Sequence, residues 1–165
     1  MQKENRPLPR WRLGLFALTG LLVIIADQLT KAWIRGNLDY GQVLTDWGFF
    51  RIVRLHNTGA AFGILRGNNL TLAIVAIIGI IAVVIMLYIL SRRWAFLNNT
   101  LVWLAVSLAV GGTIGNLIDR LRIGYVTDFL DFRLWPTFNV ADSAVTVGVI
   151  LLAYHLIFRS QTDKV

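Results

Sequence analysis

The sequence predicts a mainly α-helical membrane protein: a bundle of four transmembrane helices, with a small extracytoplasmic β-sheet element between the first and second helices. Two observations lead to this fold class. Of the 165 residues, 56% are hydrophobic and only 15% are charged, whereas about a quarter of the residues of a soluble domain are charged. The hydrophobic residues are also gathered into runs of about 20, the length at which a helix crosses the hydrocarbon core of a bilayer.

The predicted spans are rich in aliphatic residues and cover about residues 13–33, 70–90, 100–120 and 140–158. We expect residues 1–165 to form a single polytopic domain, with both ends on one side of the membrane because the number of crossings is even. The first span follows a basic stretch, as the apolar core of a secretory signal peptide does, but no clear cleavage site follows it. We therefore interpret it as an uncleaved span.

Lysine and arginine are distributed unequally between the two sides of the predicted bundle. The flanks 1–12, 91–99 and 159–165 hold 8 basic residues in 28 positions, whereas the opposite side, 34–69 and 121–139, holds 6 in 55. Basic residues concentrate in the cytoplasmic flanks of membrane proteins. Both termini should therefore be cytoplasmic, and the net charge of +7 indicates topology rather than a nucleic-acid-binding face.

Residues 37–69 form the longest connection on the outer side. The stretch from Trp47 to Leu55 is rich in aromatic and β-branched residues, which favour strands, and Asn57-Thr-Gly59 and Gly67-Asn-Asn69 provide turn signals around it. We expect a small sheet on the outer membrane surface, with an aromatic belt at the depth of the lipid headgroups. The belt comprises Trp33, Trp47, Phe49, Phe50, Tyr125 and Trp135.

Polar and charged residues gather at the outer ends of the spans, where each of them costs free energy and marks a candidate functional site. They are Asp27, Asn116, Asp119, Arg120, Asn139 and Asp142, with Asp128 in the connection before the last span. The inner halves of the spans are nearly free of charge. This asymmetry predicts one site at the outer membrane interface.

Several of these residues also have a purely structural interpretation. Asp27 and Lys31 are four residues apart on a helix, the spacing of an ion pair. Asn139 and Asp142 have the spacing of a capping box at the start of the last helix. The sequence leaves these roles open beside the functional ones.

The third span and the outer loop carry further alternatives of this kind. Gly111 and Gly115 form a small-xxx-small pair, which lets a neighbouring helix approach closely. Asn57 is a residue type that forms turns. Arg120 is placed to hold a substrate carbonyl or the outer loop, and equally to pair with Asp119 or with lipid phosphate.

The residue types present limit the chemistry. The chain has no cysteine, and His56 and His155 have no third ligand near them in sequence, so we predict no metal site and no cofactor. If residues 126–130 are extended, Asp128 shares a side with Val126 and Leu130. A carboxyl group among apolar neighbours is a candidate for a raised pKa.

Five blocks of sequence occur in a fixed order between the spans. They are Asp27-Gln-Leu-Thr-Lys31, His56-Asn-Thr-Gly-Ala-Ala-Phe62, Gly111-Gly-Thr-Ile-Gly-Asn-Leu-Ile-Asp-Arg120, Val126-Thr-Asp-Phe129 and Phe138-Asn-Val-Ala-Asp142. Together they resemble the blocks of the bacterial lipoprotein signal peptidases (signal peptidase II), over about residues 10 to 158. The resemblance implies a multi-pass aspartic peptidase of the bacterial cytoplasmic (inner) membrane, which removes signal peptides from diacylglyceryl-modified prolipoproteins.

The resemblance also implies roles for individual residues. It makes Asp128 and Asp142 the catalytic pair. The residues that it places in substrate binding or support of the site are Asp27, Asn57, Asn116, Asp119, Arg120 and Asn139. The implied partners are the prolipoprotein substrate and membrane lipids, with no nucleic acid and no particular oligomer.

The chemistry of such a pair follows from its charge. Two carboxylates about 3 Å apart cannot both stay ionised, so one accepts a proton from water while the other donates to the scissile carbonyl oxygen. Two other functions compete with this one: a small proton-coupled transporter with Asp27, Asp119 and Asp142 as its relay, and a non-catalytic membrane assembly factor. A relay needs ionisable groups through the depth of the bundle, and the inner halves offer only His155.

Overall fold

The computed structural model describes residues 10–59, 68–93 and 99–159. Its helices are α1 (Arg10–Asn37), α2 (Asn69–Arg93), α3 (Thr100–Ile123) and α4 (Val140–Tyr154), and α4 continues into a π-helical turn over His155–Arg159. Its strands are β1 (Val43–Asp46), β2 (Arg51–Asn57) and β3 (Val126–Asp131). Lys3, Arg6 and Lys164 of the predicted basic flanks, Ala60 to Phe62 of the second block, and Gly67 lie outside the described residues.

Four helices within the described ranges are long and apolar enough to cross a membrane, which confirms the predicted fold class. They cover Arg10–Asn37, Asn69–Ile89, Thr100–Ile123 and Val140–Phe158. Helix α1 extends the predicted first span at both ends. Its C-terminal half therefore carries Asp27, Lys31 and Arg35 at a spacing of four residues, which puts all three side chains on one face.

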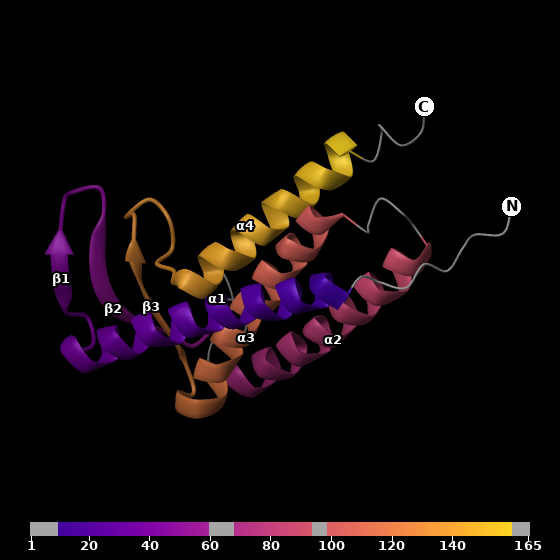
Figure 1. Ribbon diagram of the computed structural model, residues 1–165. Helices are drawn as coiled ribbons and strands as arrows, with labels where there is room; N and C mark the ends of the chain where they lie inside the picture. The colour runs from indigo at the N-terminus through magenta and orange to yellow at the C-terminus, as the bar shows by residue number, and fades with distance from the viewer. Residues whose placement is uncertain (1–9, 60–67, 94–98, 160–165) are drawn as a thin grey trace, which may run out of the picture.

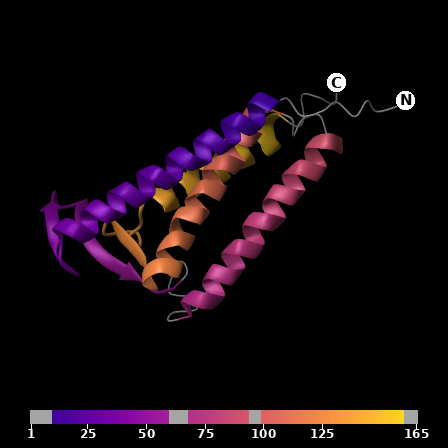
Figure 2. The ribbon, with the colours of Figure 1, turned by 60° about the horizontal axis from the view of Figure 1, so that its bottom comes forward.

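Helix α3 is the central helix and packs against α1, α2 and α4. Figure 2 shows α2 to one side of the other three helices. Asn99 caps the N-terminus of α3, where its side chain accepts the N–H of Leu101 at 2.8 Å. Gly124 caps the C-terminus, with a φ of +78° that suits a residue without a side chain. A central helix with defined ends holds the polar residues of its C-terminal half at fixed positions.

Glycines on α3 allow close helix contacts, as predicted for the pair Gly111 and Gly115, and a Cβ atom on Gly115 would lie 2.6 Å from Asp27 Oδ2 of α1. A Cβ atom on Gly111 would lie 2.9 Å from the carbonyl oxygen of Gly20 on α1, and one on Gly112 would lie 2.3 Å from the carbonyl oxygen of Ala141 on α4. No larger residue fits at either distance. The backbones of α1 and α4 therefore approach α3 closely enough for short side chains to meet.

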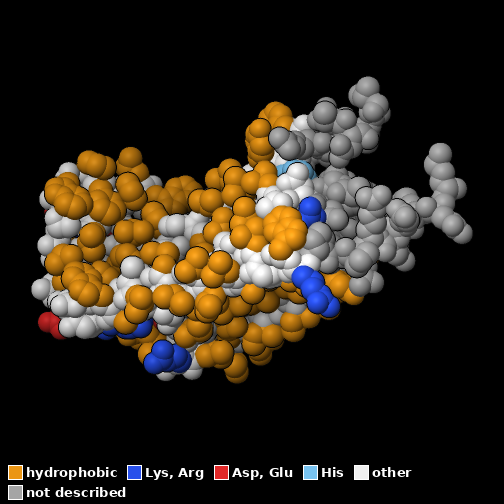
Figure 3. Space-filling view, viewed as in Figure 1, with side chains coloured by type: hydrophobic (Ala, Val, Ile, Leu, Met, Phe, Trp, Pro, Cys, Tyr) orange, Lys and Arg blue, Asp and Glu red, His pale blue; other side chains and the backbone are white. Residues whose placement is uncertain are grey.

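The exposed surface around the helix bundle is apolar. Exposed aliphatic side chains occur along α1, α2 and α4, among them Leu18, Leu22, Ile78, Ile85, Val149 and Ile150. In Figure 3 hydrophobic side chains cover much of the visible face, from the sheet along the helices. An apolar area of this extent is far larger than a soluble monomer exposes, and it is the surface that a lipid bilayer covers.

The three strands form one antiparallel sheet in the order β1-β2-β3. Strands β1 and β2 come from the predicted segment 37–69, but β3 comes from the connection between α3 and α4, so the sheet is not confined to the segment between the first two helices. Strand β3 covers the open edge of the hairpin with backbone hydrogen bonds. Phe129 of β3 packs on Ile34 and Leu38.

In Figure 1 the sheet lies at one end of the bundle, and the start of α1 and the end of α4 lie at the other. The register pairs Leu55 with Asp128 and Asn57 with Val126. This pairing brings the turn after β2 beside the strand that carries Asp128. Two segments far apart in the sequence thus meet at the end of the bundle where the polar residues gather.

The aromatic residues of the predicted belt fall into two settings. Trp33, Trp47, Phe49 and Trp135 are exposed. Phe50 stacks on Trp47 and Tyr125 stacks on His56, with ring centroids 5.6 and 3.7 Å apart. Their depth at the lipid headgroups stays a prediction.

Candidate active site

A cavity of about 480 Å³ lies between the sheet, the C-terminal part of α3 and the start of α4, and Asp128 and Asp142 both line it. Its remaining lining comes from β2 and the following turn, the C-terminal part of α3, the β3–α4 loop and the first turns of α4. These residues include Asn57, Gly59, Asn116, Arg120, Trp135, Phe138 and Val145. The cavity thus brings two carboxyl groups from different elements together in a partly apolar setting.

Asp128 is nearly inaccessible on β3, with 3% of its surface exposed. Asn139 Nδ2 donates to its Oδ1 at 2.7 Å, and Asn57 Nδ2 donates to its Oδ2 at 3.0 Å. Burial, followed by the neighbouring charge of Asp142, raises the pKa of Asp128 from 3.8 to about 7. The pKa prediction made from the apolar neighbours in the sequence is confirmed, and this group can carry a proton at neutral pH.

Asp142 lies in the first turn of α4. Its backbone N–H donates to Asn139 Oδ1 at 3.0 Å, and its Oδ2 accepts the backbone N–H of Asn139 at 3.2 Å, which confirms the predicted capping box. Its Oδ1 accepts from Asn116 Nδ2 at 2.7 Å. The cap leaves Asp142 at the cavity wall, so the structural and the functional interpretations are compatible.

Asn139 and Asn116 connect the two carboxyl groups. Asn139 Nδ2 donates to Asp128 and also to Asn116 Oδ1, at 3.1 Å. Asn116 Nδ2 in turn donates to Asp142. Each asparagine therefore uses its amide to bridge two neighbours, and the orientation of one carboxyl group depends on that of the other.

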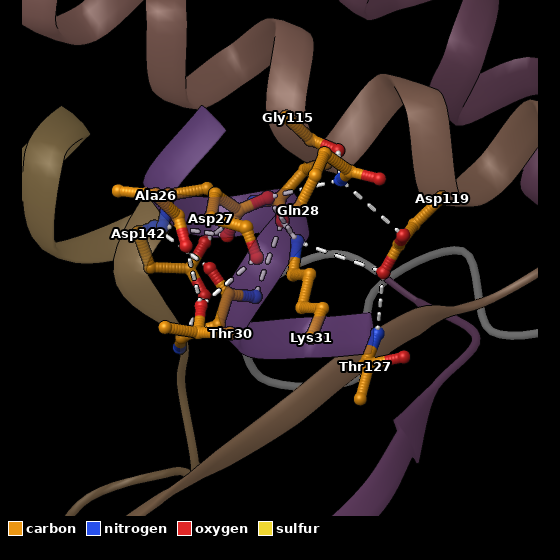
Figure 4. Close-up of polar contacts among 12 residues, drawn as sticks. Ala26, Asp27, Gln28, Thr30, Lys31, Gly115, Asp119, Thr127 and Asp142 are labelled. Carbon is orange, nitrogen blue, oxygen red and sulfur yellow. Dashed lines mark hydrogen bonds and ion pairs between the residues drawn. The ribbon is translucent and has the colours of Figure 1, made fainter. Parts of the chain in front are cut away.

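A buried ionic cluster lies next to this network. Lys31 Nζ lies 2.8 Å from Asp27 Oδ2 and 3.6 Å from Asp119 Oδ2, which confirms the predicted pair between Asp27 and Lys31. Figure 4 shows Lys31 directed between the two aspartates of α1 and α3. The remaining oxygen of Asp27, Oδ1, accepts the N–H of Ala141 at 3.0 Å. Asp27 thereby ties the start of α4 to α1.

Asp119 supports β3 rather than the cavity wall. Its Oδ2 accepts the backbone N–H of Thr127 at 3.0 Å, and its Oδ1 lies 3.1 Å from Arg35 Nη1. Arg35 also donates to Thr127 Oγ1 at 3.0 Å. Because Thr127 precedes Asp128, these contacts hold the backbone of the candidate catalytic strand against α1 and α3.

Arg120 holds the turn that follows β2, at Gly59. Its Nη2 donates to the carbonyl oxygen of Gly59 at 3.2 Å, and Asn57 Oδ1 accepts the N–H of Gly59 at 3.0 Å. The expected loop-anchoring role of Arg120 and turn-forming role of Asn57 are both present, and Asn57 contacts Asp128 as well. Within the described residues, Arg120 is not among the cations paired with Asp119.

His56 lines the cavity, stacks on Tyr125 and makes a tilted ring contact with Tyr40, and its burial lowers its pKa below 6.5. In the described part of the chain, no group of three His, Cys, Asp or Glu side chains is placed to hold a metal ion. The cavity presents carboxyl, amide and guanidinium groups, which suit acid–base chemistry on a polar bond.

The structure brings all the predicted site residues to the sheet end of the bundle and adds two further residues, Gln28 and Arg35. Gln28 Nε2 contacts Asp27 Oδ2 at 3.2 Å and Asp119 Oδ1 at 3.4 Å, and Arg35 forms the pair with Asp119. The spacing of Asp27, Lys31 and Arg35 was a signal for the second of these. Arg35 falls on this face only if α1 continues past residue 33, and hydropathy alone did not indicate that extension.

Comparison with known proteins agrees with this architecture. The family model described as "Signal peptidase (SPase) II" matches residues 19–158. The lipoprotein signal peptidase of Moorella thermoacetica is 44% identical over 143 residues, covering 86% of this chain and 92% of the relative. That of Burkholderia mallei is 43% identical over 140 residues, covering 81% and 82%.

Solved structures are similar as well. A bacterial membrane enzyme structure at 2.3 Å has a TM-score of 0.79 and 34% identity, covering 92% of each chain. A second, at 1.9 Å, has a TM-score of 0.75 and 35% identity, covering 88% of this chain and 94% of the other. With the match over most of its length, the chain belongs to the signal peptidase II family of membrane peptidases.

Proposed function

We propose that this enzyme cleaves signal peptides from diacylglyceryl-modified prolipoproteins by an aspartic mechanism, with Asp128 and Asp142 as the catalytic residues. The observation that carries the proposal is the shared cavity: two carboxyl groups from β3 and α4 line it, and the pKa of one of them is about 7. At neutral pH such a pair holds one proton between two groups, which is the state that peptide hydrolysis by a water molecule requires.

The reaction takes place in two steps. Asp142 accepts a proton from water as the water oxygen bonds to the scissile carbonyl carbon, and Asp128 donates its proton to the carbonyl oxygen. The C–N bond of the tetrahedral intermediate then breaks. The leaving amine takes the proton held by Asp142, and Asp128 recovers a proton from the hydroxyl of the intermediate. No covalent acyl-enzyme forms, so the absence of cysteine is no obstacle.

The amides around the pair support this reaction. Asn116 and Asn139 hold the carboxyl groups in place through the contacts of 2.7 Å to Asp142 and Asp128. Preorganised donors of this kind stabilise the charge that develops in a transition state. Arg120, at the cavity wall, keeps the loop at Gly59 next to the site.

The substrate class fits the placement of the cavity. A lipid-modified cysteine stays at the membrane surface while the signal helix lies in the bilayer, so the bond to be cut lies at the end of the hydrophobic helices. We place that end at the outer face of the cytoplasmic membrane, with both termini in the cytoplasm, because the described basic residues Arg10 and Arg12 begin α1 at the opposite end.

The test is cleavage of a purified diacylglyceryl-modified prolipoprotein by the enzyme in lipid. Asp128→Asn and Asp142→Asn should each abolish cleavage, and Asp39→Asn is the matched control, since Asp39 is an exposed acid on the same side that does not line the cavity. An uncut precursor with the wild-type enzyme, or normal cleavage by either cavity variant, contradicts the proposal. Proton flux through the wild type without cleavage would favour a transporter instead.

A further inference from the structure

Lys31 is fully buried, with 0% of its surface exposed, although it does not line the cavity. Its Nζ atom has three neighbours: Asp27 Oδ2 at 2.8 Å, Asn116 Oδ1 at 2.8 Å and Asp119 Oδ2 at 3.6 Å. The two aspartates suffice to balance its charge. The short contact with the neutral amide of Asn116 therefore points to a role beyond an ion pair.

This contact decides which way the Asn116 amide points. An ammonium group is only a donor, so Asn116 presents Oδ1 to Lys31 and Nδ2 to the opposite side. There Nδ2 donates to Asp142 Oδ1 at 2.7 Å. Asn139 Nδ2 donates to the same Oδ1 of Asn116, at 3.1 Å, and reinforces this orientation. A flipped amide would set its N–H groups against two donors, Lys31 and Asn139, and would take the side-chain donor away from Asp142 Oδ1.

The two carboxyl groups of the site therefore differ. Asp142 accepts the Asn116 amide on one oxygen and the backbone N–H of Asn139 on the other, and it lies in the first turn of α4, where the helix dipole favours a negative charge. Asp128 is a strand residue whose burial disfavours its ionised form. The asymmetry assigns the negative charge to one member of the pair.

We propose that Lys31 is a positioning residue for the catalytic pair: by fixing the orientation of Asn116, it holds an N–H donor on Asp142 Oδ1 and so supports Asp142 as the proton acceptor. This inference rests on the proposed function. Charged and titratable side chains surround the pair on every element packed around it. They are Asp27, Lys31 and Arg35 from α1, His56 from β2, and Asp119 and Arg120 from α3.

The test is the pH dependence of kcat for the full-length enzyme in lipid, with the diacylglyceryl-modified prolipoprotein as substrate. Lys31→Met removes the ammonium group and keeps the length of the side chain. Because Asp142 loses the donor that Asn116 holds on it, kcat should fall and the acidic limb of its pH profile should move to higher pH, whereas KM should change little because Lys31 does not line the cavity.

The matched control is Arg35→Met. It removes a cation from the same helix, and Arg35 pairs with the same Asp119 as Lys31 does, but the contacts of Arg35 are with Asp119 and Thr127 and not with Asn116. Its acidic limb should therefore stay in place even if the variant is less stable. Lys31→Arg, which keeps a charged donor, should restore the wild-type limb.

A double variant separates an effect on the pH profile from a loss of folding. Lys31→Met leaves Asp27 buried without its cation, so Asp27→Asn/Lys31→Met removes both members of the pair, which destabilises less than removing one. Its acidic limb should move as far as that of Lys31→Met. An unmoved acidic limb in Lys31→Met, or an equal shift of the limb in Arg35→Met, overturns the proposal. Loss of the folded state in both Lys31→Met and Asp27→Asn/Lys31→Met overturns it as well. Failure of the wild type to cut contradicts the proposed function instead.

Discussion

Arg35 of α1 and Asp119 of α3 form an ion pair, with Nη1 3.1 Å from Oδ1, and both side chains also bind Thr127, the residue before Asp128. One pair of side chains thus fixes the candidate catalytic strand against two membrane-spanning helices. The carboxylate is buried and holds the backbone of β3, so the position of Asp128 depends on a contact that lies outside the cavity.

Asp119→Ala should lower both stability and activity. It leaves Arg35 without its carboxylate partner and Thr127 without the acceptor of its N–H, and breaking a buried ion pair by removing one partner costs about 3–5 kcal/mol. Equilibrium unfolding in mixed micelles measures the loss, and cleavage per folded molecule measures the displacement of Asp128. Asp46→Ala, which breaks the exposed pair with Arg133, is the control and should cost far less. Equal losses for the two variants would contradict the support role.

The stability of the enzyme should fall as the pH rises through neutrality. The pKa of Asp128 is raised from 3.8 to about 7 in the folded chain, so between these values the folded state binds more protons than the unfolded state. The contribution of this group is fully present below the lower value and is lost as the pH passes the upper one. The melting temperature of the wild type should therefore decrease between about pH 5 and pH 8 more than that of Asp128→Asn. Parallel curves would argue against the raised pKa.

Gly112→Ala should be strongly destabilising. A Cβ atom at this position would lie 2.3 Å from the carbonyl oxygen of Ala141, so α4 must move away from α3 and take Asp142 with it. Gly79→Ala is the matched control: Gly79 lies within α2, and no atom lies within 4 Å of its added Cβ. We expect Gly112→Ala to lose cleavage and thermal stability while Gly79→Ala keeps both. Tolerance of alanine at Gly112 would show that the helix approach is not tight.

The orientation in the membrane can be tested with single cysteines, since the chain has none of its own. The loop between β3 and α4 lies at the sheet end of the bundle, and the start of α1 lies at the opposite end (Figure 1). That loop contains Leu134, which is 99% exposed, and α1 begins at Arg10. A membrane-impermeant maleimide should label Leu134→Cys in intact spheroplasts, and should label Arg10→Cys only after lysis. The reverse pattern would invert the proposed topology and move the site to the cytoplasmic face.

Much of the fold could be predicted from local patterns. Four helices of spanning length follow from runs of apolar residues, and the capping box of Asn139 and Asp142 and the pair of Asp27 and Lys31 follow from spacings of three and four residues. These features depend on residues close together in the chain. Periodicity and hydropathy therefore determine them whatever surrounds the segment.

The third strand and the support of Asp128 could not be predicted in this way. Residues 126–131 are almost all buried and show no simple alternation of apolar and polar residues, and pairing with the open edge of β2 makes them a strand. The contacts of Arg35 with Asp119 and Thr127 join residues 84 and 92 positions apart. No local pattern records which side chain lies opposite at such a separation.

By itself, the sequence determined that the chain has four membrane-spanning helices and that its scarce polar residues gather at one end of them, because the length and polarity of a segment are local properties. Only the tertiary structure decided how those residues are connected: Lys31 to Asn116, Asn116 to Asp142, and Asn57 to Asp128. These partners meet because glycines let α1 and α4 approach α3 and because β3 pairs with β2. The geometry of helix crossing and strand pairing, rather than any motif, sets the differences between the two carboxyl groups.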